Sequence, residues 1–299
     1  MNRLLKNLFD FERPETTGER LFYRLFELAV LYWVLHFAWD WGFYIQRIGE
    51  VVLPLGIAQY IDISFMFEHG VSLLNAGAIT VAAALAFFRR WRYGYLAALL
   101  LLHLQYVSRF CLGEISHGSN IIGMVLVGMA LAPLCFDDRD RQRRFVFGFS
   151  YFFLGLGYVS AAVCKLVASG PGWVDGRHLW MWIAERTVDT FSITGEIHYT
   201  WVQELALSAV PIATLILTFG LLAEFFAFLM WFKRTRPYIM TLLLTMHIGI
   251  LLSMQINFPA NNVMLLLLAY PWHAWIDRGL AHLGATAFER IRRASLRFT

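Results

Sequence analysis

Long apolar runs dominate the chain, and charged residues are confined to the short stretches between them. Most of the runs reach the ~20 residues that an α-helix needs to cross a bilayer. They cover residues 21–43, 69–88, 93–112, 118–136, 145–167, 211–232, 237–256 and 262–276. They are too long and continuous for the alternating strands of an outer-membrane barrel. The pattern therefore predicts an all-α integral membrane protein, a polytopic bundle of about eight transmembrane helices.

Proline complicates two places in this pattern. The apolar stretch 202–232 exceeds one bilayer crossing, and Pro211 divides it. Residues 202–210 are therefore expected to lie in the membrane interface or to re-enter it. The last run, 262–276, is short and contains Pro271, which makes it the least regular of the eight.

Composition agrees with the membrane class. The chain is 59% hydrophobic and only 15% charged, whereas soluble domains are about 25% charged. The first twenty residues are charged and have no apolar core, so we expect no cleavable signal peptide. The three cysteines have no metal-ligand spacing. No aromatic and basic patch indicates a nucleic-acid partner, and the net charge of +4 follows from topology.

The distribution of lysine and arginine predicts the orientation in the membrane. With eight crossings, 20 of the 25 basic residues lie on the side of the two termini. Seven crossings would move the arginine-rich C-terminus to the other side and reduce this asymmetry. Both termini are therefore predicted to be cytoplasmic, and a bacterial inner membrane is the expected location. Residues 1–276 form the membrane domain, and 277–299 read as a basic amphipathic helix on its surface.

Lys165 lies near the outer end of the run 145–167. A lysine costs roughly 2.5–3.5 kcal/mol at the centre of a spanning helix on insertion scales, and less near its end. One interpretation is that the ammonium group reaches out to the interface. The other is a desolvated amine that can act as a base near neutral pH. Position alone leaves both open.

Further ionisable residues fall within the apolar runs: Glu224, His247, His103, His36 and Asp40. Glu224 lies nine residues from Lys233, roughly 13 Å along a helix and close to the midplane. His36 and Asp40 stand four apart on one helical face and can pair. Each of these residues, taken alone, is interpreted as forming an interhelical hydrogen bond, which contributes about 0.6 kcal/mol to stability on average. Together with Lys165 and His117, the set predicts a polar cavity.

Polar residues also collect in the loops on the predicted outer face. The largest loop, 168–201, contains SGPGWVDGRH, whose glycines and proline predict a tight turn after the fifth span. Trp173 is expected at the interface. The other outer loops include GEISHGSN, with His117 and Asn120, and NFPANN, with Asn257 and Asn261.

Two stretches carry a resemblance to a known family. The segment GYVSAAVCKLVASGPGWVDG has Lys165 followed by Trp173 and Gly176. It resembles the active-site lysine segment of the vitamin K-dependent gamma-carboxylase family, part of the wider group of horizontally transferred transmembrane (HTTM) domains. The stretch from Leu222 through KRTR and His247 to NFPANNVMLLLLAYPW is similar to the late membrane segment of that family. SHGSN, residues 116–120, falls where the carboxylases carry an asparagine–histidine pair.

The resemblance implies a function for the outer face. Lys165 would be the base that deprotonates a vitamin K-like quinol, with O2 and CO2 as co-substrates for carboxylation of a glutamate. His117 would give polar support, and His247 would have a structural or substrate-stabilising role. Substrate or quinone contacts are then expected from the remaining polar and interface residues: Trp173, Gly176, Glu224, Asn120, Asn257 and Asn261. No metal site is expected.

The chain also departs from the carboxylase pattern. Cys164 stands where the carboxylases have a second lysine, and Ser116 stands where they have an asparagine. No large extracytoplasmic part follows the eighth span, so quinol-linked oxidation, or modification of a small peptide with a partner protein, also fits. Two other functions stay open: a transporter that uses the buried Glu224, His103 and His247, and a non-catalytic membrane maturation factor.

Overall fold

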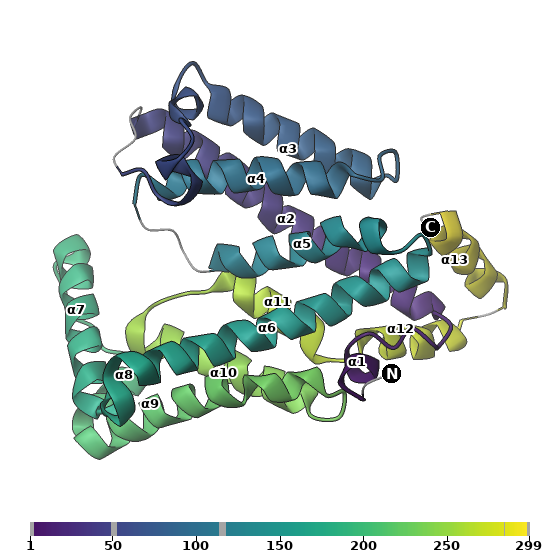
Figure 1. Cartoon of the computed structure of the whole chain (residues 1–299). Helices are drawn as coiled ribbons and strands as arrows, with labels where there is room; N and C mark the ends of the chain where they lie inside the picture. Colours follow the sequence, from purple (N-terminus) through teal and green to yellow (C-terminus); the bar gives the residue numbers. More distant parts are fainter. Residues whose placement is uncertain (1–2, 49–52, 114–117, 284, 298–299) are drawn as a thin grey trace. The chain divides into compact units, whose positions relative to one another are not determined.

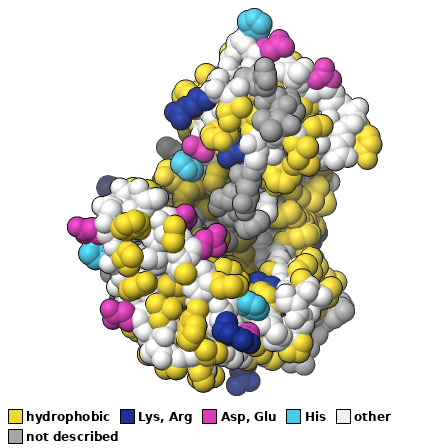
Figure 2. All heavy atoms as spheres, turned by 90° about the vertical axis from the view of Figure 1, so that its left-hand side faces the viewer, with side chains coloured by type: hydrophobic (Ala, Val, Ile, Leu, Met, Phe, Trp, Pro, Cys, Tyr) yellow, Lys and Arg dark blue, Asp and Glu magenta, His cyan; other side chains and the backbone are white. Residues whose placement is uncertain are grey.

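A computed structural model describes residues 3–48, 53–113, 118–283 and 285–297. All the regular secondary structure in these ranges is helical, and the described residues contain no strand. Five helices are long and apolar enough to cross a membrane: Thr17–Ile48, Gly118–Cys135, Arg139–Val174, Val210–Trp231 and Arg236–Met254. Figure 2 shows apolar side chains over much of one face, with charged groups scattered among them. These features are those of a helical membrane protein in contact with lipid.

The chain forms two compact units. The lysine unit comprises Met1–Leu8 and Tyr151–Tyr270, and the arginine unit comprises Phe9–Ser150 and Pro271–Thr299. The long helix α6 (Arg139–Ser169) contributes its first part to the arginine unit and its second part to the lysine unit (Figure 1).

The lysine unit is built on the second part of α6. Its other elements are α1 (Arg3–Leu8), η3 (Gly170–Val174), α7 (Gly176–Thr194), α8 (Trp201–Ser208), α9 (Val210–Phe225), η4 (Phe226–Trp231), α10 (Arg236–Met254) and α11 (Pro259–Ala269). A buried apolar core joins α7, α8 and α9 through Leu179, Ile183, Ala206, Ala213 and Leu217. The indole of Trp180 donates to the carbonyl oxygen of Ala206 at 2.7 Å, which ties α7 to α8.

Helix α7 occupies most of the segment 168–201, which the sequence pattern predicted to be a loop. Leu179 and Ile183 are four residues apart and both buried, so α7 has one apolar face directed at the core. Charged residues on either side of this stretch, such as Arg177, Glu185 and Arg186, conceal the apolar face from a search for long apolar runs. Gly195, with φ 74°, ends the helix in the left-handed conformation that glycine tolerates.

The start of α7 depends on its N-cap residue, Asp175, and on its first two residues, Gly176 and Arg177. The Asp175 carboxylate accepts from the Arg177 backbone and side chain, which lowers the pKa of Asp175 to about 2. A Cβ at Gly176 would clash with the carbonyl oxygen of Val210. The Gly176 N–H donates to Thr214 Oγ1 at 2.9 Å. Gly176 therefore allows α7 to begin in direct contact with α9.

The arginine unit contains the remaining helices. They are α2 (Thr17–Ile48), η1 (Gly56–Gln59), η2 (Ser64–Phe67), α3 (Val71–Phe87), α4 (Gly94–Phe110), α5 (Gly118–Cys135), α12 (Trp272–Ala281) and α13 (Ala285–Arg297). Gln105 connects α2, α3 and α4, because its amide donates to the carbonyl oxygens of Ala38 and Ser72 and accepts from Asn75. Buried amides of this kind link apolar helices without charge.

The eight predicted apolar runs all coincide with helices. Residues 202–210, expected at the interface, contain the short helix α8. The run 262–276 is interrupted, because α11 ends at Ala269 and α12 begins at Trp272, after Pro271. In the C-terminal segment, α13 is helical over Ala285–Arg297. The number of crossings and the side on which the termini lie stay predictions.

Candidate functional site

Lys165 lies four residues before the end of α6, and the chain continues as the 3-10 helix η3 to Val174. Its amine donates to Oε2 of Glu224 on α9, with an N···O distance of 2.5 Å. The same nitrogen lies 4.7 Å from the centroid of the Trp173 ring, within range of a cation–π interaction. The Lys165 side chain is 29% exposed. The amine is therefore held by a carboxylate and an aromatic face.

Glu224 is the next-to-last residue of α9 and is 7% exposed. Among the described residues, Lys165 is the only hydrogen-bond partner of its carboxylate. A carboxylate can accept about four hydrogen bonds, so most of its capacity is unused by the protein. Within the described residues, the charge of the Glu224 carboxylate is therefore balanced by one flexible cation, Lys165.

A second polar pair lies close to the first in the lysine unit. The hydroxyl of Tyr158 on α6 is hydrogen bonded to Nε2 of His247 on α10 at 2.8 Å. Tyr158 precedes Lys165 by seven residues, or two helical turns, so both lie on one face of α6. The His247 ring packs edge-on against Phe258, with 5.1 Å between ring centroids. His247 itself is 4% exposed.

The two pairs form one group, which we call the lysine cluster: Lys165, Glu224, Tyr158, His247, Trp173 and Asn261. Lys165 is near enough to His247 for an electrostatic interaction, and Glu224 is near enough to Tyr158. Asn261 also interacts with the Tyr158 side chain. Two buried polar atoms of the cluster have no partner within the described structure, His247 Nδ1 and Asn261 Oδ1. Because buried polar atoms are rarely left unpaired, these atoms suit contacts with a ligand.

Three other predicted site residues, Gly176, Asn257 and Asn120, are not part of this cluster. Gly176 packs α7 against α9, as described above. Asn257 is exposed just before α11, and Asn120 is exposed near the start of α5 in the arginine unit. His117 is outside the described residues, so its position relative to Lys165 stays a prediction.

Three ionisable residues expected in the polar cavity are on exposed surface of the arginine unit instead. His103, His36 and Asp40 are all exposed. The pairing that their spacing allows between His36 and Asp40 is not formed, since no hydrogen bond or ion pair joins these two described residues. The His36 ring packs against Tyr32, with ring centroids 6.2 Å apart. Aromatic neighbours on the same helix therefore compete with the carboxylate for the imidazole.

The arginine unit has a polar cluster that the sequence analysis missed. Glu27 on α2 is fully buried and accepts from Arg24 at 2.6 Å and from Arg89 at 2.9 and 3.1 Å. The hydroxyl of Tyr95 donates to the same carboxylate at 2.5 Å. A signal was present, because Glu27 is a glutamate inside the apolar run 21–43, just as Glu224 is inside 211–232.

Comparison of the chain with known protein families, with curated proteins and with solved structures gave no match. Within the described residues, no group of three or more His, Cys, Asp or Glu side chains is arranged to hold a metal ion.

Proposed function

We propose that the chain is a membrane enzyme of the carboxylase-like superfamily in which Lys165 acts as a base. The observation that carries the proposal is the Lys165–Glu224 ion pair among apolar helices, with Trp173 against the amine. A buried ion pair contributes little to stability, since apolar residues of similar size often do as well or better. A requirement other than stability therefore explains why these two charges are present.

The pair can generate a neutral amine without an external base. Transfer of one proton from Nζ of Lys165 to Oε2 of Glu224 leaves an uncharged amine beside an uncharged acid. The amine then takes the proton of a substrate hydroxyl, so that an N–H bond forms, the O–H bond breaks and the electron pair stays on the substrate oxygen. An arginine cannot serve in this way, because it does not lose its proton in proteins.

A quinol is the substrate class that fits this cluster. It is flat, apolar and carries acidic hydroxyls, and it reaches a membrane-embedded amine through the lipid. Trp173, Tyr158 and Phe258 offer aromatic surface, while His247 and Asn261 offer polar atoms without partners. As in the family that the chain resembles, O2 would oxidise the deprotonated quinol and CO2 would be the second co-substrate if a glutamate of a small peptide is carboxylated.

The proposed topology has eight crossings, with both termini in the cytoplasm of a bacterial cell. The division of 20 basic residues against five supports it. A transporter is a weaker alternative. Transport requires polar groups along a path across the bilayer. The ionisable groups within the apolar runs of the lysine unit, Lys165, Glu224 and His247, instead belong to one cluster, and His103 lies exposed in the other unit.

The test compares Lys165→Arg and Lys165→Met with the wild-type chain. Arginine keeps the positive charge of Lys165 but cannot act as a base. Methionine has neither the charge nor a basic group. We expect consumption of vitamin K hydroquinone in air to fall about 100-fold or more in both variants, the usual size of a general-base contribution. The measurement uses purified protein in lipid nanodiscs that elutes as a single species in gel filtration.

Lys233→Arg and Lys233→Met are the matched controls, because Lys233 belongs to the same unit and precedes α10. Both should keep wild-type activity. Full activity of Lys165→Arg would refute the role of Lys165 as a base. Absence of quinol consumption by the wild-type protein, with and without a peptide substrate, would refute the quinol as its substrate.

A further inference from the structure

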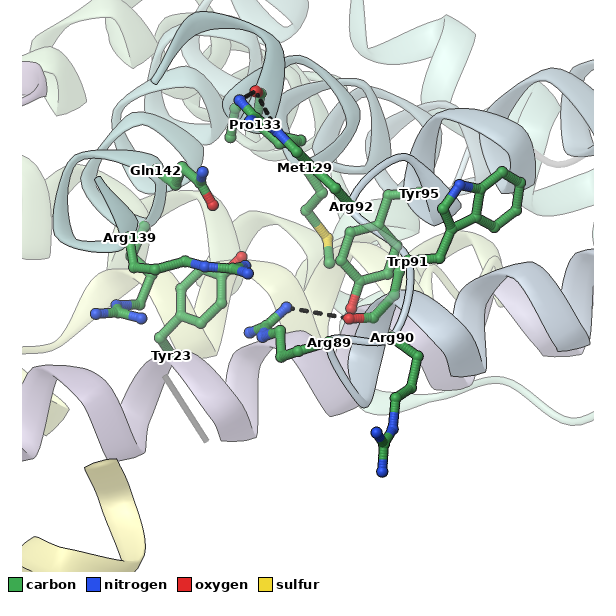
Figure 3. Close-up of a pocket in the computed structure, with 13 residues that line it drawn as sticks. Tyr23, Arg89, Arg90, Trp91, Arg92, Tyr95, Met129, Pro133, Arg139 and Gln142 are labelled. Atoms are coloured by element: carbon green, nitrogen blue, oxygen red, sulfur yellow. Dashed lines mark hydrogen bonds between the residues drawn. The ribbon is translucent and has the colours of Figure 1, made fainter. Parts of the chain in front are cut away.

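A pocket of about 280 Å³ lies in the arginine unit, apart from the lysine cluster (Figure 3). It is formed between the turn that joins α3 to α4, the end of α5 and the start of α6. Cationic and phenolic side chains dominate its wall: Arg89, Arg92, Arg139, Arg143, Tyr23 and Tyr95. Arg90 also borders the pocket, but Figure 3 shows its side chain extending away from the other arginines.

Most of these cations already have acceptors. Arg89 is bound to Glu27, as described above, and Arg143 forms ion pairs with Glu15 and Asp140. Arg92 donates to the Pro133 carbonyl oxygen and to Asp137 at 2.8 Å. The carboxylates near the pocket are therefore engaged by these three arginines and their neighbours.

Arg139 is different, because its half-buried guanidinium forms no hydrogen bond or ion pair with any described residue. The positive charges of Arg89 and Arg143 oppose it. A cation that faces other cations without an acceptor is unfavourable unless an anion is supplied.

Two more donors at the pocket lack acceptors in the described structure. Tyr23 is 5% exposed, and its hydroxyl makes no hydrogen bond with any residue that the structure describes. Nε of Arg89 is buried and likewise has no hydrogen-bond partner in the described part of the chain. Among the described residues, three donor groups of pocket-lining side chains thus lack acceptors, while the nearby carboxylates of Glu27, Glu15 and Asp140 are already paired. Together these donors define a site for an acceptor-rich anion.

We propose that this pocket binds a phosphate group, with Arg139 as its principal ligand and Tyr23 as a neutral donor. A guanidinium matches the oxygens of a phosphate in a two-point hydrogen bond. The volume is at the small end for ligand pockets, which suits a head group and excludes a nucleotide held entirely within it. The pocket lies at the arginine-rich ends of apolar helices, where basic pockets bind anionic lipid head groups.

The phosphate belongs either to a lipid or to a soluble molecule, and the same experiment separates these sources. Delipidated full-length protein is titrated with short-chain phosphatidylglycerol, with phosphatidylcholine as the zwitterionic lipid, and separately with inorganic phosphate and pyrophosphate. Binding is followed by native mass spectrometry and by thermal unfolding. A lipid site gives a saturable 1:1 adduct with phosphatidylglycerol alone, and a soluble-phosphate site gives it with phosphate or pyrophosphate.

Arg139→Gln should weaken this adduct about 10- to 100-fold, the size expected for one charge-assisted hydrogen-bonding group. Arg141→Gln is the matched control, because Arg141 is two residues further along α6, exposed and outside the pocket. It removes the same charge and should leave affinity within about twofold. Tyr23→Phe keeps every charge and should weaken the adduct several-fold, which tests the pocket even if Arg139→Gln does not fold.

Equal losses in Arg139→Gln and Arg141→Gln would show diffuse attraction of anions to a basic surface and would overturn the proposal. Wild-type affinity in the Tyr23→Phe variant would overturn the assignment of its hydroxyl. Failure of all four probes to form a saturable adduct would remove the site altogether. None of these outcomes depends on the activity proposed for Lys165, because neither native mass spectrometry nor thermal unfolding measures a reaction of a quinol.

Discussion

Two buried glutamates, one in each unit, stand in similar surroundings and have very different partners. Glu27 lies in α2 with no exposed surface and is bound by two arginines and a tyrosine hydroxyl. Glu224 lies in α9, is 7% exposed and is bound by the single amine of Lys165. Both are carboxylates within apolar runs, so the sequence around them does not distinguish them.

The difference lies in what each set of partners permits. The arginines at Glu27 keep their protons at every usable pH, and their forked groups occupy several of its acceptor positions. The cations of that site therefore cannot take part in proton transfer at Glu27. The lysine at Glu224 can give up its proton, is 29% exposed and leaves most acceptor positions of the carboxylate free. The identity and number of the cations therefore separate a structural carboxylate from one that is equipped for proton transfer.

Glu27→Gln should produce the largest effect. It leaves Arg24 and Arg89 without a compensating charge in a buried position, which costs about 3–5 kcal/mol. We expect this loss in the free energy of unfolding, measured by SDS titration in mixed micelles. Glu68→Gln is the control, because the Glu68 side chain is 62% exposed in the same unit. A loss below about 1 kcal/mol at Glu27 would show that the two arginines find other acceptors.

Glu224→Gln should cost less, about 1–2 kcal/mol, between the values for buried and exposed pairs. The reason is that the Lys165 side chain is flexible and partly exposed, so its ammonium can find another partner. The same SDS titration measures the loss, with Glu204→Gln as the control because Glu204 is exposed on α8.

The double variant Lys165→Met with Glu224→Gln sharpens this comparison, since it removes both charges. Its stability should return to within about 1 kcal/mol of wild type, while quinol consumption should be abolished. A double variant as unstable as Glu224→Gln alone would mean that the pair is structural, as at Glu27.

Tyr158→Phe should have the smallest effect. It removes the hydroxyl that is hydrogen bonded to Nε2 of His247 and leaves both ring nitrogens of that residue unpaired. The expected loss in unfolding free energy is about 1 kcal/mol. Tyr199→Phe serves as the control, because Tyr199 is 45% exposed. No measurable change at Tyr158 would indicate that His247 is not restrained by this hydrogen bond.

The apolar runs predicted the helices that carry the site, because the length of an apolar run depends only on local sequence. The same rule singled out Lys165, Glu224 and His247 one by one, as ionisable groups inside such runs. Their pairing was not predictable from the runs. Counting residues placed Glu224 near the midplane and Lys165 near the outer end, whereas helical structure continues beyond Lys165 as far as Val174.

Other features depend on contacts that a linear pattern does not contain. Tyr158 could have been found from its seven-residue spacing to Lys165, once that lysine was chosen as the reference. Helix α7 was missed because its apolar face is only one side of a charged segment, although Leu179 and Ile183 show the helical period. Asp40 was assigned to His36 by spacing alone, but the ring has aromatic neighbours on its own helix.

The 3-10 helix η4 has a mechanical consequence for Glu224. Hydrogen bonding changes from the α to the 3-10 pattern between Phe225 and Phe226, one residue after the carboxylate. The rise per residue changes from about 1.5 Å to about 2.0 Å at such a junction, and the rotation from about 100° to about 120°. Advancing the junction by one residue thus turns the following side chains by about 20°, at the expense of one exchanged hydrogen bond. Glu224 sits beside a joint in the backbone, where small rotations cost far less than they would in the middle of an unbroken helix.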